Sequence, residues 1–130
     1  MKEKNNLPEK FGNTPLKRLV YLYSMIWSYL YGFKPNIQWG VVGKLLKPLY
    51  TEYTEWQVAA MICLHFSWHG ASGEDEFAFK QLQEKCFPLE WLPKNFNSYR
   101  AYITNVLGID LENKEQLKEF AVGTVNKFKK

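Results

Sequence analysis

The segment from Trp39 to Lys47 contains residue types that bind phosphate groups. Its sequence places Gly40, Gly43, Lys44 and Lys47 at spacings of three and four. In a helix these four residues fall within about a third of the circumference, so two cations flank a backbone that lacks side chains. Such a surface lets a nucleic-acid backbone approach while the ammonium groups neutralise its phosphates. It equally lets another helix of the same chain pack closely, which is the other interpretation of the two glycines.

The same segment does not meet the requirements of a nucleotide-binding P-loop. That loop needs four residues between its glycines and a Ser or Thr after its lysine. Here two residues separate Gly40 from Gly43, and Leu45 follows Lys44. ATP binding by this device is therefore excluded. Trp39 lies at the margin of the apolar side of the segment, where it either fills the core or stacks on a nucleobase.

The histidines and acidic residues do not form a pattern typical of an enzyme. His65 and His69 are four residues apart on one helix face, but no HExxH glutamate lies between them and no third ligand has a fixed spacing. The cluster from Glu74 to Glu76 is typical of a helix start. Nucleophile elbows, glycine-rich dinucleotide turns and paired carboxylates are absent from the sequence. We therefore expect no enzyme activity, no catalytic residue, no metal, no cofactor and no small-molecule substrate.

Helical periodicity dominates the chain, and local signals mark where the helices begin and end. Thr14 with Pro15 starts the first helix, and Thr54 has capping-box spacing to Gln57. Apolar residues at spacings of three and four predict helices over about 15–31, 37–49, 55–69, 76–86, 98–107 and 114–130. Pro48 is expected to end or kink the second of these helices. The third of these is apolar on nearly all sides and should be the most buried. We expect an all-α, compact single-domain bundle of about six helices spanning residues 13–130, preceded by a flexible N-terminal tail of residues 1–12.

Composition points to an intracellular protein. The chain has 130 residues and two cysteines, which form no CxxC pair, so neither a disulfide scaffold nor a zinc knuckle is expected. An uncharged stretch at 19–33 is shorter than the roughly 20 residues that cross a bilayer. No signal peptide is recognisable at the start. A cytoplasmic location without membrane contact is the expectation.

Charge is distributed in blocks. Residues 1–47 contain eight Lys or Arg and two Glu, a net charge of +6, whereas residues 48–93 contain two against seven, a net charge of −5. The basic block contains Lys17, Arg18 and Lys34 in addition to Lys44 and Lys47. It either forms a cationic face that attracts a polyanion or is scattered over solvated surfaces.

Residues 31–66 resemble a helical module of phage and prophage replication initiation proteins, which are also called replisome organisers. The matching residues are Gly32, Pro35, Trp39-Gly40, Gly43-Lys44, Leu46-Lys47, Tyr53-Thr54 and Phe66. Residues 98–107 resemble the closing helix of that module, so the resemblance extends over about 31–107. It implies a protein of the host cytoplasm that binds DNA at an origin and brings in a replicative helicase or its loader. Val42 departs from the pattern, because an acidic residue is common there.

Two functional hypotheses follow. In the first, a phage or mobile-element replication accessory protein binds single- or double-stranded DNA, a replication protein such as a helicase or loader, or both. Its nucleic-acid-binding residues would be Lys17, Arg18, Lys34, Trp39, Gly40, Gly43, Lys44 and Lys47. In the second, a small phage-encoded accessory or inhibitory protein binds a host or phage protein through an aromatic surface. Its anchors would be Phe87, Trp91 and Phe96 in the connection FPLEWLPKNF.

Overall fold

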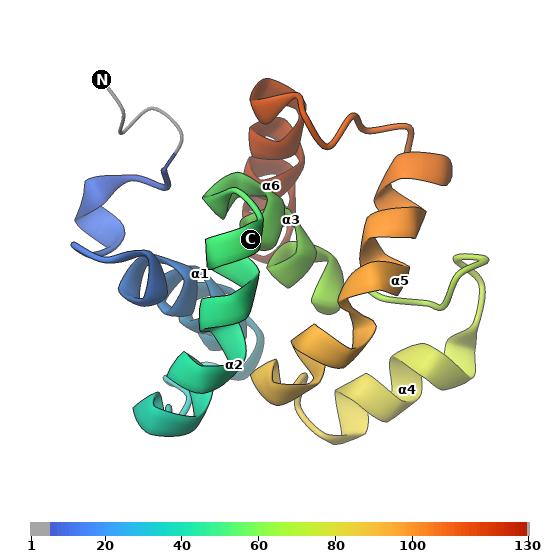
Figure 1. Ribbon diagram of the computed structural model, residues 1–130. Helices are drawn as coiled ribbons and strands as arrows, with labels where there is room; N and C mark the ends of the chain where they lie inside the picture. Colours follow the sequence, from blue (N-terminus) through green and yellow to red (C-terminus); the bar gives the residue numbers. More distant parts are fainter. Residues whose placement is uncertain (1–5, 130) are drawn as a thin grey trace.

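The computed structural model of the protein describes residues 6–129 and is organised around one buried helix (Figure 1). Every residue of α3 (Glu55–His65) is buried. Three longer helices cover it, namely α1 (Pro15–Tyr31), α5 (Leu92–Asn105) and α6 (Lys114–Lys129). A helix that is apolar all round has to be enclosed in this way. The predictions of an all-α fold and of a central third helix are confirmed.

Two further helices and two short turns complete the described chain. Helix α2 (Trp39–Glu52) packs against α1, α3 and α5, whereas α4 (Glu76–Glu84) lies at the edge of the molecule below α5 in Figure 1. The 3₁₀ turns are η2 (Glu9–Phe11) and η3 (Leu89–Trp91). Residues 6–129 contain no strand. Within the same range no helix has both the length and the apolar character that crossing a membrane requires.

Side-chain caps fix several helix starts at the predicted places. The Thr14 hydroxyl accepts a hydrogen bond from the Lys17 amide at the start of α1. Thr54 and Gln57 form the predicted capping box at the start of α3. Such caps satisfy amide groups that have no partner within the helix, and each stabilises the helix by roughly 1 kcal/mol. Because these signals are local, the sequence revealed them.

The boundaries of three helices differ from the prediction. Helix α2 begins at Trp39 instead of near Asn36, and it continues through Pro48 to Glu52. Helix α3 ends at His65, four residues before the predicted end. Helix α5 begins at Leu92, within the segment predicted to be a connection, because Pro93 occupies the first helical turn where no amide donor is needed.

The described part of the N-terminal segment packs on the domain. The side chain of Leu7 is buried, and its amide donates a hydrogen bond to Glu55 Oε2 over 3.1 Å. Phe11 packs on Tyr21 of α1 with ring centroids 4.7 Å apart. Leu7 and Phe11, which were predicted to belong to a flexible tail, thus contact the helical domain, while residues 1–5 lie outside the described residues.

Candidate nucleic-acid interface

One face of α2 is open to solvent and carries two lysines. Lys44 and Lys47 are exposed, and a Cβ added to Gly40 would meet no atom within 4 Å. The opposite face of the helix is buried through Val42 and Leu46. Neither lysine forms an ion pair with any of residues 6–129. The face therefore has the cationic character that the spacing predicted.

The two glycines of α2 have different surroundings. A Cβ on Gly43 would lie 3.5 Å from Leu16 Cδ2 of α1, an ordinary van der Waals contact, whereas Gly40 faces open space. Gly43 thus lies where α1 and α2 approach each other, which agrees with the helix-packing interpretation for this residue. Gly40 alone leaves bare backbone at the surface.

The N-terminus of α2 adds to the positive potential of this region. Gln38 precedes the helix without forming a side-chain cap, and no acidic residue occupies the first turn. Amide groups at a helix start carry partial positive charge and favour anions. By contrast, Thr14, Thr54 and Asp75 cap α1, α3 and α4 with side-chain oxygens.

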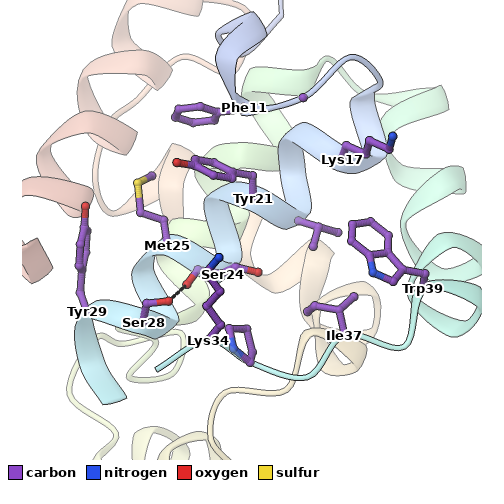
Figure 2. A pocket seen from close by; sticks show the side chains of 13 residues that line it. Phe11, Lys17, Tyr21, Ser24, Met25, Ser28, Tyr29, Lys34, Ile37 and Trp39 are labelled. Carbon is purple, nitrogen blue, oxygen red and sulfur yellow. Dashed lines mark hydrogen bonds between the residues drawn. The ribbon is translucent and has the colours of Figure 1, made fainter. Parts of the chain in front are cut away.

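Three of the predicted residues lie around one groove beside α1 (Figure 2). Lys17 lies on α1, Lys34 lies on the loop that connects α1 to α2, and Trp39 is the first residue of α2. The groove has a volume of about 570 Å³. We call it the α1–α2 groove, and its other lining residues are Phe11, Gly12, Val20, Tyr21, Ser24, Met25, Ser28, Tyr29, Pro35 and Ile37. The fold thereby brings together residues that lie between Phe11 and Trp39 in the sequence.

Sequence reasoning missed the aromatic lining of this groove. Tyr21 is 47% exposed and Trp39 is 49% exposed, while Tyr29 is half-buried. Tyr21 follows Lys17 by four residues, and Ser24 and Ser28 continue at spacings of three and four. This polar and aromatic stripe opposite the apolar face of the first helix is the signal that could have revealed the part of the lining that α1 contributes.

The prediction for Arg18 is not supported by its position. Its side chain is 8% exposed, and its Nε and Nη2 donate hydrogen bonds to Glu55 Oε2 and Oε1 over 2.7 and 2.9 Å. Nη1 also donates to the Gly12 carbonyl oxygen over 3.2 Å. The hydrogen bonds to Glu55 raise the pKa of Arg18 above its ordinary value. Because this buried charge already has a carboxylate partner, it is not available to a phosphate.

The predicted aromatic protein-binding loop lies mostly in the core. Phe87 and Phe96 are each 3% exposed, and Phe87 packs on Phe66 with ring centroids 5.3 Å apart. Trp91 is half-buried, with the Lys94 ammonium 5.6 Å from its ring centroid. Phe87 and Phe96 therefore cannot anchor a partner in this conformation, and the prediction is wrong for both.

The two histidines lie in separate environments. His65 is fully buried, with Nε2 2.9 Å from the Pro88 carbonyl oxygen and Nδ1 2.7 Å from the Tyr99 hydroxyl. His69 stacks on Phe79 at a centroid distance of 4.3 Å. Among residues 6–129, no group of three or more His, Cys, Asp or Glu side chains is placed to hold a metal ion.

Comparisons with known proteins do not assign this chain to a family. A scan against protein-family models, a search among curated proteins and a search among solved structures each found no match to this chain.

Proposed function

We propose that the protein binds nucleic acid through the surface formed by α1, α2 and the loop between them. The observation that carries this proposal is a set of four exposed lysines on these elements. Lys17 and Lys34 line the α1–α2 groove together with the half-exposed ring of Trp39, and Lys44 and Lys47 lie on α2. None of the four forms an ion pair with any other residue of the described chain. Cations without carboxylate partners are what a phosphate backbone requires.

The charge around this surface supports the same conclusion. No Asp or Glu occurs among the described residues that line the α1–α2 groove. The charge of Arg18 is neutralised by Glu55 and does not belong to the groove lining. The acidic residues of the middle of the chain are spread over several elements. Exposed Glu74 and Glu84 lie before and at the end of α4, Glu52 ends α2, and Glu90 of η3 lines a separate pocket with residues 35–38 of the loop before α2. The attraction for a polyanion is therefore expected at the groove itself, whose described lining carries lysines and no carboxylate.

Salt dependence tests this proposal. If all four lysines contact phosphates, the logarithm of the association constant for a single strand falls with the logarithm of salt concentration with a slope of about −3. Substituting Lys44→Gln and Lys47→Gln should lower the magnitude of that slope by about 1.4. The measurement is fluorescence anisotropy of labelled single- and double-stranded oligonucleotides between about 50 and about 200 mM salt.

A matched variant controls for net charge. Lys127→Gln and Lys129→Gln remove two exposed lysines from the end of α6, outside the α1–α2 groove. This variant should keep the slope of the natural protein. Equal slopes for the two double variants, or no binding of either oligonucleotide at low salt, would contradict the proposal.

A role in phage or mobile-element DNA replication rests on the resemblance of residues 31–66 alone. We include that role in the proposal, with a replicative helicase or its loader as the expected protein partner. The test is whether the immobilised protein retains such a helicase from purified components. If the Lys44→Gln, Lys47→Gln variant no longer retains the helicase, the helicase contact lies on the lysine-bearing face of α2. If the natural protein does not retain the helicase, the proposed role in replication is contradicted.

A further inference from the structure

The α1–α2 groove combines aromatic surface with unused hydrogen-bonding groups. Tyr21 and Trp39 each leave about half of their surface exposed. Phe11 supports Tyr21 from the N-terminal side, with ring centroids 4.7 Å apart and planes inclined by 41°. The Tyr21 ring, supported in this way, offers a flat stacking surface, and holding it in place costs little further conformational entropy when a ligand binds.

The hydroxyl groups along α1 are the second element of the groove. The Ser28 hydroxyl donates to the Ser24 carbonyl oxygen over 2.7 Å. Within the described part of the chain, the hydroxyls of Ser24, Tyr21 and Tyr29 have no hydrogen-bond partner. All three residues line the groove. These groups can donate to or accept from the polar edge of a ligand.

The lysines supply the third element. Figure 2 shows Lys34 extending from the connecting loop toward Ser24, while Lys17 lies on α1 at another part of the groove. The side chains between them are aromatic, apolar or hydroxyl-bearing. A ligand that fits has to be flat and apolar at its centre, polar at its edges and negatively charged on both sides. An unpaired nucleobase with its flanking phosphates has this chemistry.

We propose that the α1–α2 groove holds an unpaired base of a single-stranded nucleic acid. The base stacks on Trp39 or Tyr21, and Lys17 and Lys34 bind the phosphates on either side. This inference deepens the proposed function and rests on it, because it assigns single strands as the preferred ligand. Bases in a duplex are stacked on one another and cannot reach the aromatic rings, so a duplex contacts the lysines alone.

The decisive experiment compares ligands of equal charge with and without bases. An oligothymidylate of about 15 nucleotides and an abasic oligonucleotide of the same length carry the same phosphates. With the natural protein, we expect the abasic strand and the duplex to bind about 5- to 100-fold more weakly than oligothymidylate, the range of one stacked base. Equal affinity for the abasic strand and oligothymidylate would overturn the inference. Titration with an oligouridylate of the same length shows whether RNA or DNA binds more tightly. Tighter binding of either single strand than of the duplex agrees with the proposal.

Variants at Trp39 locate the stacked base. Trp39→Ala should weaken oligothymidylate binding by about 5- to 100-fold with an unchanged salt slope, because it removes a stacking surface and no charge. Trp39→Phe keeps a ring and should stay within about threefold of the natural protein, yet lose the quenching of tryptophan fluorescence on binding. Phe77→Ala is the matched control, since Phe77 is 68% exposed on α4 outside the groove; it should leave affinity unchanged.

The two proposals fail in distinguishable ways. If nothing binds with a measurable salt slope, the proposed function fails. If strands bind with the expected slope but the abasic strand binds as tightly as oligothymidylate, only the groove inference fails. The abasic comparison uses the natural protein, so it decides even if Trp39→Ala does not fold.

Discussion

The buried imidazole of His65 makes the stability of the protein depend on pH in a way that can be calculated. A carbonyl oxygen only accepts hydrogen bonds, so Nε2 carries the proton that points to Pro88, and Nδ1 accepts from the Tyr99 hydroxyl. The neutral ring is thus fully satisfied. Burial disfavours the charged form and lowers the pKa of His65 from 6.5 to about 4.

The sign and size of the effect follow from proton linkage. Between pH 6.5 and about 4 the unfolded chain binds a proton at His65 and the folded protein does not. The contribution of neutral His65 to the free energy of unfolding is therefore complete above pH 6.5 and is lost as the pH falls toward 4. A depression of roughly 2.5 pKa units corresponds to a loss of about 3 kcal/mol in the free energy of unfolding.

A variant without an ionisable group isolates this contribution. Urea unfolding of the natural protein and of His65→Gln at pH 7.5 and at pH 4 gives two differences in unfolding free energy. Carboxylates titrate alike in both proteins and cancel, so the advantage of the natural protein should shrink by about 3 kcal/mol at the lower pH. An advantage that stays constant within about 0.5 kcal/mol would refute the assignment of His65 as a buried neutral residue. His69→Gln serves as the control for removal of a histidine.

Two further predictions concern stability. Glu55→Gln should lower the free energy of unfolding by about 3 kcal/mol in urea, because it leaves the buried Arg18 cation without a charged partner; a loss below about 1 kcal/mol would contradict this. Gly43→Ala should raise the free energy of unfolding by about 0.5 to 1 kcal/mol, since the added methyl group meets Leu16 at an ordinary contact distance. Gly123→Ala on α6, where a Cβ meets nothing, is the control, and a loss for Gly43→Ala alone would show that the α1–α2 contact cannot relax.

Local signals in the sequence were sufficient for the class of fold and for several helix starts. Thr14 and the Thr54–Gln57 pair act within one turn, so their effect does not depend on the rest of the molecule. Prolines were harder to interpret. Pro48, which was expected to end or kink the second helix, lies inside α2. Pro93, which was expected to lie in a connection, occupies the first turn of α5. Tertiary packing overrode the local preference at Pro48.

The candidate site could be predicted only in part, because its residues meet through tertiary structure. The lysine spacing on α2 follows from helix geometry alone and was predicted. The arrangement of Lys17, Lys34 and Trp39 around one groove depends on how α1, its following loop and α2 pack, and no local pattern encodes that. Arg18 shows the converse case. Its partner Glu55 is 37 residues away, so its sequence neighbourhood could not reveal that the charge is buried and paired.

The Arg18–Glu55 pair also connects the stability of the domain to the shape of the groove. Glu55 accepts from the Leu7 amide as well as from Arg18, and Arg18 donates to the Gly12 carbonyl. These contacts hold both ends of the segment that carries Phe11, which supports Tyr21 in the groove. An arginine expected to neutralise phosphate thus positions an aromatic wall instead. Glu55→Gln should consequently weaken single-strand binding through the loss of a fixed stacking surface, while the salt slope set by the exposed lysines stays the same.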